Sequence, residues 1–263
     1  MIGVFDSGVG GMTVARAIEE ALPDYPLIYF GDTARSPYGP KSPERIIHYS
    51  RQNTRFLLEQ GAQVVVIACN SAASVASDLI RQEFDVPVFE VITPAVQQAI
   101  AATRNGVVGV IGTRATIRSG IYRKMIAAAA PGVRVESSPC PLLVSLVEEG
   151  WLDRRETKMV VRSYLHPLKM KQVDTLVLGC THYPLLRSII QPRIGKRVRV
   201  IDSAASVAAE LRIFMEKNPD IGGDMVAGQG NRYYVSDVTD TALEIAAKIF
   251  GRKINLELAN DNL

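Results

Sequence analysis

Short apolar runs alternate along the chain with longer segments in which apolar residues recur at helical spacing. The runs are rich in β-branched residues, which is typical of strands buried on both faces of a parallel sheet. We predict strands at residues 2–5, 27–30, 64–68, 88–91, 107–111, 133–136, 175–178 and 198–201. Helices are predicted at 11–22, 43–60, 72–83, 94–104, 116–129, 154–171, 184–194, 203–217 and 239–250, followed by a loosely held tail at 255–263. This alternation predicts an α/β fold built on parallel sheets.

The two halves of the chain follow the same plan. IGVFDSG at residues 2–8 precedes VVVIACNSA at 64–72, and VVGVIGT at 107–113 precedes TLVLGCTHY at 175–183. Each half ends a strand in a cysteine directly before a helix, at the sheet edge where open α/β sheets bind ligands. We predict two pseudo-symmetric α/β domains with the active site in the cleft between them. The first would comprise residues 1–93 and 205–263, and the second residues 94–204.

The composition is that of an ordinary globular protein. The 263 residues are 47% hydrophobic and 22% charged, enough for one large or two medium-sized domains. A net charge of +3 without a basic cluster gives no reason to expect a nucleic-acid partner. No apolar run reaches the ~18 residues of a membrane span, and the first residues do not resemble a signal peptide. Three cysteines argue against a disulfide framework, so we expect a cytoplasmic protein with free thiols.

A glycine-rich turn, DSGVGG at residues 6–11, follows the first predicted strand. It resembles a dinucleotide-binding fingerprint, with Asp32 placed as a ribose ligand. However, Thr13 stands where the third glycine belongs, and no lysine completes a phosphate loop. A tight turn that needs small residues explains the glycines equally well, but leaves Asp6 unexplained. Nucleotide binding without turnover therefore remains a second hypothesis.

Two cysteine corners carry the candidate chemistry. Cys69 is followed by residues that often cap helices, and a thiol near a helix N-terminus is biased toward the thiolate. Cys180 is followed by Thr181 and His182, and the imidazole could exchange a proton with the thiol or orient it. A buried cysteine is commonly a core residue. Two matching corners, one with Asp6 and the other with His182 as proton partner, favour function.

The remaining cysteine and histidines give weaker signals. Cys140 lies between two prolines and is interpreted as structural, and His48 and His166 as surface residues on helices. Zinc sites usually show paired ligands such as Cys-x-x-Cys, which are absent here. A zinc site would instead require four side chains to converge: Cys69, Cys180, His182 and Asp6. We therefore expect no metal.

Two thiols across a cleft suit the inversion of a carbon stereocentre. One group removes a proton from one face of the carbon while the other supplies a proton to the opposite face. A thiol pKa of ~8.5 allows either role with modest tuning. Hydroxyl, amide and backbone N–H groups at helix starts would hold a substrate carboxylate; the candidates are Ser7, Asn70, Ser71, Thr113, Thr116 and Thr181. The loop at residues 34–43 either closes over the ligand or is an ordinary surface turn.

Six motifs in order resemble the glutamate racemases of the aspartate/glutamate racemase superfamily, and the resemblance covers essentially the whole chain. They are IGVFDSGVGGMTV at 2–14, YFGDTARSPYGPKS at 29–42, VVIACNSA at 65–72, GVIGTRATIRSGIY at 109–122, LVEEG at 146–150 and LVLGCTHYPLL at 176–186. The resemblance implies interconversion of L- and D-glutamate through the two cysteines, without pyridoxal phosphate, another cofactor or a metal.

The resemblance also implies residue roles. Cys69 would act on the D-enantiomer and Cys180 on the L-enantiomer, with Asp6 and His182 as their proton-handling neighbours. A further catalytic glutamate is assigned to Glu148, with the adjacent Glu149 as the alternative. The implied substrate contacts are Asp6, Ser7, Pro37, Tyr38, Gly39, Asn70, Ser71, Thr113, Thr116, Thr181 and His182. Many relatives have threonine in place of Ser71, a change that keeps the hydroxyl.

The implied biological role is the supply of D-glutamate for bacterial peptidoglycan in the cytoplasm. Relatives often form homodimers, although the sequence does not indicate a surface for one. The same scaffold would also serve aspartate or hydantoin racemisation, because one methylene is worth only ~1–3 kcal/mol in discrimination. The choice between these substrates stays open at this level.

Overall fold

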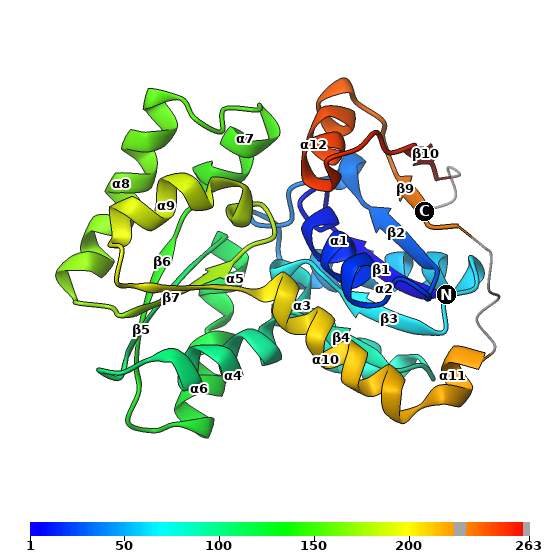
Figure 1. The fold of residues 1–263 in the computed structure, drawn as a ribbon, viewed down its shortest axis with the longest axis horizontal. Helices are drawn as coiled ribbons and strands as arrows, with labels where there is room; N and C mark the ends of the chain where they lie inside the picture. Colours follow the sequence, from blue (N-terminus) through cyan, green and yellow to red (C-terminus); the bar gives the residue numbers. More distant parts are fainter. Residues whose placement is uncertain (224–229, 260–263) are drawn as a thin grey trace.

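The computed structural model describes residues 1–223 and 230–259 and contains two parallel sheets side by side (Figure 1). The larger sheet has the strand order β10-β9-β2-β1-β3-β4, and the smaller has the order β6-β5-β7-β8. Every neighbouring pair of strands is parallel. The predicted α/β class with two parallel sheets is therefore confirmed.

The larger sheet contains the first four predicted strands and two that the pattern did not predict. Its strands are β1 Ile2–Asp6, β2 Leu27–Gly31, β3 Val64–Ile67, β4 Val88–Glu90, β9 Arg232–Val235 and β10 Glu257–Leu258. Its helices are α1 Met12–Ala21, η1 Thr33–Arg35, α2 Pro43–Glu59, α3 Asn70–Glu83, α10 Ser203–Lys217, α11 Pro219–Gly223 and α12 Asp240–Phe250. The unpredicted strands are short, and both residues of β10 are exposed, so their hydrophobic pattern is weak.

The end of the chain is held more firmly than the sequence predicts. Strand β10 pairs with β9, and Ile254, Leu256 and Ala259 are buried beside it. The prediction of a loosely held tail is wrong for residues 255–259, because these side chains pack into the core of the larger sheet. Residues 260–263 of that prediction lie outside the described residues.

The smaller sheet contains the other four predicted strands, β5 Val107–Gly112, β6 Arg134–Pro139, β7 Thr175–Gly179 and β8 Arg199–Asp202. Its helices are α4 Ile92–Ala102, α5 Arg114–Ser119, α6 Ile121–Ala129, α7 Leu142–Glu148, α8 Arg155–Met170, η2 Tyr183–Leu186 and α9 Arg187–Ile194. The helix predicted at 116–129 is two helices, because Gly120 adopts a left-handed φ of 68° between them. Helix α7 was not predicted.

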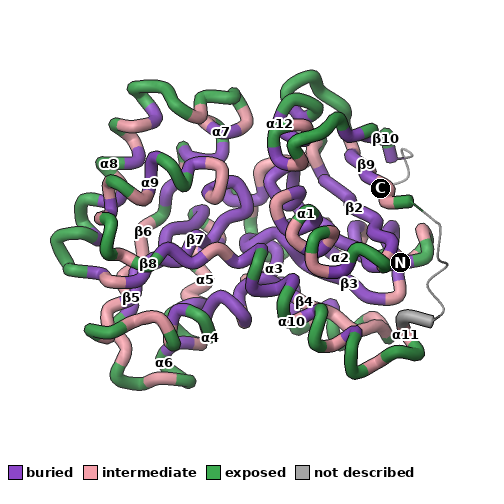
Figure 2. Tube along the Cα trace, viewed as in Figure 1, coloured by how far each residue is buried: buried purple, intermediate pink, exposed green. Residues whose placement is uncertain are grey.

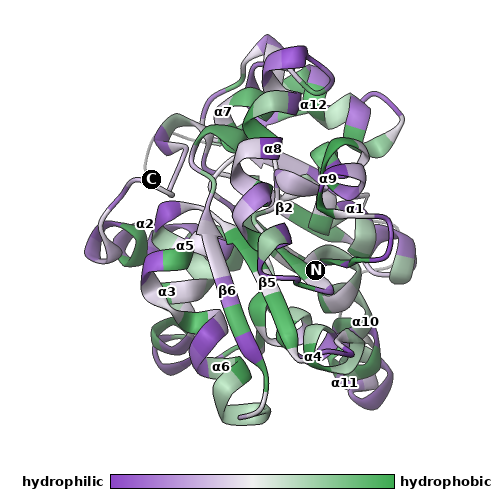
Figure 3. Cartoon of the chain, turned by 90° about the vertical axis from the view of Figure 1, so that its left-hand side faces the viewer, coloured by the Kyte–Doolittle hydropathy of each residue, from purple (hydrophilic) through white to green (hydrophobic). Residues whose placement is uncertain are grey.

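The strands at the centre of each sheet are buried on both faces, as the apolar runs predict (Figure 2). Along β7, Val177 belongs to a hydrophobic cluster shared with the larger sheet, whereas Leu176 and Leu178 belong to a second cluster beneath α7, α8 and α9. Helix α10 packs on both α1 and α4 and so joins the two sheets. The edge strand β6 is more polar than β5 (Figure 3), which is typical of sheet edges.

The carboxyl ends of the central strands carry the predicted site residues. Asp6 ends β1, Cys69 follows β3, Thr113 follows β5 and Cys180 follows β7. No helix in the described part of the chain is long and apolar enough to cross a membrane. The predicted domain boundaries remain a prediction; α4 begins at Ile92 and α10 at Ser203, close to both of them.

Candidate active site

Asp6 organises the turn that follows β1. Its Oδ2 accepts hydrogen bonds from the backbone N–H groups of Gly8 and Gly11, each at 3.1 Å. Its Oδ1 accepts a hydrogen bond of 3.2 Å from the hydroxyl of Thr181, which comes from the smaller sheet. Burial raises the pKa of Asp6, although the charge of His182 and these hydrogen bonds act in the opposite direction. The carboxyl group therefore ties the two sheets together beneath the site.

The glycines of this turn are required by close contacts. A Cβ atom on Gly10 would lie 2.7 Å from the Thr181 hydroxyl and collide with the His182 ring. A Cβ atom on Gly11 would lie 2.7 Å from Cγ of Asp6. Since Asp6 already accepts from the N–H groups of Gly8 and Gly11, those two groups are not available to cradle a pyrophosphate. The tight-turn interpretation thus accounts for the glycines, and for Asp6 as well.

Asp32, the would-be ribose ligand, is fully engaged within the protein. Both of its carboxylate oxygens lie 2.8 Å from Nε of Arg35, one accepts from the Tyr38 hydroxyl, and the other accepts from Ser236 at 3.1 Å. The residue is completely buried. Asp32 therefore has a structural role and is not available as a ribose ligand. It holds the loop at residues 34–43 against the larger sheet.

Cys69 occupies the N-cap position of α3 and is buried. Its thiol contacts the Ser7 hydroxyl at 3.5 Å. Burial and the charge of Asp6 raise the pKa of Cys69 to about 12, while the Ser7 hydroxyl and the backbone N–H of Ala72 act in the opposite direction. The helix N-terminus thus acts on Cys69 in the expected direction, through the N–H of Ala72, but burial outweighs it. At neutral pH this sulfur carries its proton.

Cys180 lies beside an imidazole. Its sulfur is 3.8 Å from Nδ1 of His182, and both residues are buried. Nε2 of His182 lies 3.3 Å from Oε1 of Glu148, an ion-pair distance, although the orientation falls short of a hydrogen bond. Burial lowers the pKa of His182, but the contacts with Cys180 and Glu148 outweigh it and raise the pKa well above its usual value. The imidazole thus lies between a sulfur and a carboxylate that both favour its protonated form.

Glu148 ends α7 and contacts His182 from the far side of the ring. Burial raises its pKa, but His182 and a 3.1 Å hydrogen bond from Ser36 outweigh burial and bring the pKa below its usual value. The neighbouring Glu149 is exposed, and no side-chain contact links it to the histidine. Of the two glutamates considered from the sequence, Glu148 is the one that reaches this network.

Hydroxyl and amide groups line the opposite wall. The Ser71 and Thr113 hydroxyls lie 2.8 Å apart, and Thr116 contacts Thr113 from behind at 3.1 Å. The amide oxygen of Asn70 accepts a 2.7 Å hydrogen bond from Tyr122, while its amide nitrogen is buried without a partner. A buried donor without a partner is unfavourable unless a ligand satisfies it. This wall is therefore ready to receive an anionic group.

The loop at residues 34–43 forms part of the site rather than an ordinary surface turn. Its carbonyl at Gly39 accepts a 3.0 Å hydrogen bond from the N–H of Ala115 in α5, so it contacts the smaller sheet as well as the larger. Tyr38 is 1% exposed and receives a 3.1 Å hydrogen bond from Asn53. The middle of the loop, at Tyr38 and Gly39, is thus packed between the two sheets.

Both thiols open on one small cavity. It is lined by Ser7, Pro37, Tyr38, Gly39, Cys69, Asn70, Ser71, Thr113, Val144, Cys180, Thr181 and His182. The volume that the centre of a water molecule can occupy in this cavity is about 10 Å³. The cavity therefore has room for roughly one water molecule. The other predicted residues, Asp6, Thr116 and Glu148, do not line it but contact Thr181, Thr113 and His182.

The cavity also contains one residue that the sequence analysis did not name. Val144 comes from α7, and the apolar spacing of LLVSLVE at residues 142–148 could have indicated this helix. An outer hollow of about 160 Å³ shares Val144 and Thr113 with the cavity and adds Arg114. Arg114 is exposed and has no hydrogen-bond or ion-pair partner within the described ranges. It is the charged side chain at the mouth of the site.

The remaining candidates lie elsewhere. Cys140 is buried in the cluster beneath α8, with its thiol 3.5 Å from the carbonyl of Ser138, and His48 and His166 are exposed. Across residues 1–223 and 230–259, no three His, Cys, Asp or Glu side chains come together as metal ligands would. These placements agree with the interpretation of Cys140 as structural and of the two histidines as surface residues.

Comparison with known proteins points to one family. Residues 2–211 match the family model described as Asp/Glu/Hydantoin racemase. The glutamate racemase of Geobacter metallireducens is 45% identical over 257 residues, which cover 96% of this chain and 93% of that protein. The crystal structure of a glutamate racemase isoform from Bacillus anthracis has a TM-score of 0.91 at 35% identity and covers 99% of this chain and 97% of that one. The Francisella tularensis glutamate racemase in complex with D-glutamate has a TM-score of 0.90 at 34% identity and covers 98% and 97%.

Proposed function

The chain belongs to the Asp/Glu/Hydantoin racemase family, and we propose that it interconverts L-glutamate and D-glutamate through Cys69 and Cys180. The observation that carries the proposal is that two thiols, from strand ends far apart in the sequence, open on one cavity. The relatives named glutamate racemase support glutamate as the substrate.

The proposed chemistry is a proton exchange at the α-carbon. One sulfur, as thiolate, takes the α-hydrogen as a proton, and the other, as thiol, gives its proton to the opposite face of the carbanion. The C–H bond breaks and forms without a change in oxidation state, so we assign no step to a cofactor. Cys69 acts on D-glutamate and Cys180 on L-glutamate. Each turnover leaves the protonation of the two sulfurs reversed.

The surroundings of the sulfurs support this division. The raised pKa of Cys69 keeps it as a thiol, which suits the donor of the final proton when L-glutamate is converted. His182 lies within reach of Cys180 and would manage the proton there, with Glu148 positioning the imidazole. Asp6 would serve Cys69 in the corresponding way from beneath the β1 turn. General acid–base groups of this kind each contribute about 10²–10⁴-fold to a rate.

Substrate carboxylates would be held by neutral groups. The unpartnered amide nitrogen of Asn70 and the hydroxyls of Ser71, Thr113 and Thr181 line the cavity and can donate to carboxylate oxygens. Backbone groups of the loop that contains Pro37, Tyr38 and Gly39, together with Ser7 and His182, would complete the contacts. Since the cavity holds about one water molecule, its walls must separate to admit glutamate.

Aspartate and hydantoins are the competing substrates within the same family. A pocket discriminates one methylene by only ~1–3 kcal/mol, so the geometry alone does not choose between aspartate and glutamate. The decisive measurement is the racemisation rate of both amino acids side by side. We expect kcat/KM to be higher for glutamate, and a higher value for aspartate would reassign the substrate.

We place this activity in the cytoplasm, where it would supply D-glutamate for peptidoglycan and thereby support cell-wall growth and cell shape. The three cysteines are all free thiols, as a reducing compartment requires. A bacterial strain that needs added D-glutamate for growth tests this role. Expression of the chain should restore growth without D-glutamate, and expression of the Cys180→Ser variant should not.

The two-thiol mechanism is tested by incubating each enantiomer with the enzyme in heavy water. The native chain should incorporate deuterium at the α-carbon as it racemises. We expect Cys69→Ser and Cys180→Ser to lower racemisation by at least about 10²-fold, because a hydroxyl is a far weaker proton acceptor than a thiolate. Cys140→Ser, which changes a thiol in the core, is the matched control and should retain activity. Full turnover in either active-site variant would refute the mechanism.

A further inference from the structure

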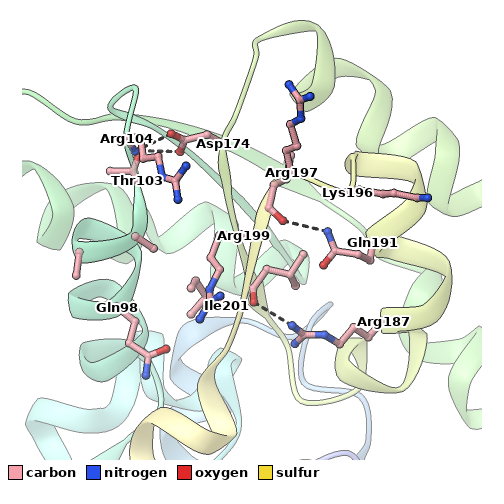
Figure 4. A pocket seen from close by; sticks show the side chains of 14 residues that line it. Gln98, Thr103, Arg104, Asp174, Arg187, Gln191, Lys196, Arg197, Arg199 and Ile201 are labelled. Carbon is pink, nitrogen blue, oxygen red and sulfur yellow. Dashed lines mark hydrogen bonds between the residues drawn. The ribbon is translucent and has the colours of Figure 1, made fainter.

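A second cavity, of about 770 Å³, lies at the end of the smaller sheet opposite the thiols (Figure 4). It is bordered by α4, α9 and β8, and by the residues that precede β5 and β7, whereas the thiol site lies beyond the carboxyl ends of β5 and β7. We call it the basic pocket, after its cationic side chains Arg104, Arg187, Lys196, Arg197 and Arg199.

The positive charge of the basic pocket is only partly balanced within the protein, where Asp202 interacts with Arg187. Its one carboxylate, Asp174, accepts hydrogen bonds from the Thr103 hydroxyl and from the backbone N–H groups of Arg104 and Asn105, at 2.7–2.8 Å. None of the five cationic side chains forms an ion pair with the described residues. The C-termini of α4 and α9 add about half a negative charge each. The five cations exceed these contributions and leave the pocket positive.

The edge of β8 is already covered. Strand β8 lies at the edge of its sheet. The carbonyl of Val198, just before it, accepts a hydrogen bond from Gln191 at 3.0 Å, and the carbonyl of Val200, within it, accepts one from Arg187 at 3.3 Å. An added peptide strand would have to displace both side chains. The pocket therefore suits a small ligand better than a peptide that extends the sheet.

Two arginines remain available to such a ligand. Figure 4 shows Arg104 and Arg199 on the α4 side of β8, with Arg104 beside Thr103 and Asp174 and Arg199 extending toward Gln98. Neither guanidinium has a hydrogen-bond partner within the described ranges, because Arg104 uses only its backbone N–H. A guanidinium group presents a planar fork of N–H donors that matches phosphate oxygens. An anion between the two arginines would also relieve their mutual repulsion.

We propose that the basic pocket binds a small phosphate-bearing anion with at least two negative charges, held between Arg104 and Arg199. Its volume lies within the ~300–1,000 Å³ of typical small-molecule sites, so an organic group can accompany the phosphates. This ligand would occupy a site separate from the thiols and would bind whether or not glutamate is present.

The test is calorimetric titration of the full chain with inorganic pyrophosphate at low ionic strength. The native protein should show one saturable site whose affinity falls as salt is added. Arg104→Gln and Arg199→Gln should each weaken binding about tenfold or more, since each removes a charged hydrogen-bonding group. Arg55→Gln is the matched control: it removes one exposed arginine from α2, on the larger sheet, and should bind like the native protein.

Three results would overturn the proposal. The first is the absence of saturable binding to the native protein. The second is an equal loss in Arg55→Gln, which would indicate attraction to the overall surface charge. The third is displacement of pyrophosphate by D-glutamate, which would place the anion at the thiol site. Because all three arginines are exposed, the variants should fold, and thermal unfolding curves check this. Pyrophosphate binding is measured without turnover, so its outcome is independent of the racemase proposal.

Discussion

The two cysteine corners share a sequence plan but differ in their electrostatic surroundings. Cys69 lies against the Ser7 hydroxyl, and burial together with the nearby charge of Asp6 raises its pKa to about 12. Cys180 instead lies 3.8 Å from His182, an imidazole whose pKa is raised well above its usual value. Burial therefore favours the thiol at one sulfur, and the other has an imidazole beside it that can exchange a proton with it.

The difference shows that a repeated backbone arrangement does not impose repeated chemistry. Each corner is a strand, a cysteine and a helix, but the partners come from other parts of the chain: α7 supplies Glu148 to one corner, and the glycine turn supplies Asp6 to the other. A racemase does not need equal corners. Its substrate and product are mirror images and therefore have equal free energies. The equilibrium between them requires only that kcat/KM be equal in the two directions.

The largest expected effect comes from breaking the Cys180 corner with His182→Asn. We expect kcat/KM to fall for both enantiomers by about 10²–10⁴-fold, because the proton partner of one sulfur is lost. The slowed step should be the transfer at Cys180. α-Deuterated L-glutamate should therefore show a larger isotope effect than α-deuterated D-glutamate. His166→Asn, on the exposed face of α8, is the control, and equal isotope effects would contradict the division of labour between the sulfurs.

Gly10→Ala tests the contact through which the β1 turn approaches the Cys180 corner. The added Cβ would lie 2.7 Å from the Thr181 hydroxyl and collide with the His182 ring. We expect activity to fall about 10²-fold through misplacement of the histidine, and the free energy of unfolding to fall by about 1–3 kcal/mol. Rates and denaturant unfolding measure both effects. Gly132→Ala is the control, because a Cβ there would meet nothing within 4 Å, and it should change neither activity nor stability. Native activity in Gly10→Ala would show that the turn can move aside.

Glu148→Gln sharpens the comparison by removing the carboxylate that helps to raise the pKa of His182. We expect kcat/KM at neutral pH to fall about tenfold, and its alkaline limb to move to lower pH. A raised pKa in the folded state stabilises the protein fully below the usual value of ~6.5, and this stabilisation is lost as pH rises through the folded-state pKa. In the variant that loss should occur at lower pH.

The measurement for Glu148→Gln is the pH profile of kcat/KM together with the free energy of unfolding from neutral to alkaline pH. Glu149→Gln removes the exposed neighbouring charge and serves as the control. Unchanged profiles in Glu148→Gln would mean that the carboxylate does not act through the histidine.

The smallest expected effect concerns Arg114, at the mouth shared by both corners. Glutamate carries a net negative charge at neutral pH, and a cation at the entrance speeds its approach. Arg114→Gln should raise KM a few-fold with little change in kcat, and should reduce the dependence of kcat/KM on ionic strength. Arg118→Gln, further along the same helix, is the control. An undiminished salt dependence in Arg114→Gln would assign the attraction to other charges.

The sequence by itself determined strands β1 to β8, most of the helices and the cysteine corners. These features are local: a β-branched run buried on both faces needs no partner to be recognised, and a residue that follows such a strand in a parallel sheet lies at the carboxyl edge. For that reason the sequence assigns Asp6 and Cys69 to the carboxyl edge of one sheet, and Thr113 and Cys180 to that of the other. The motifs also sufficed to indicate the family.

Only the tertiary structure decided the features that depend on residues far apart in the chain. Strands β9 and β10 are defined by the sheet they join, and only the packing of helix α7 shows that Val144 lines the cavity and that Glu148 reaches His182. The protonation state of Cys69 likewise depends on residues far from it in the sequence. The helix start favours the thiolate, but burial between two sheets outweighs it and raises the pKa of Cys69. Desolvation depends on everything packed around a group, which local sequence does not record.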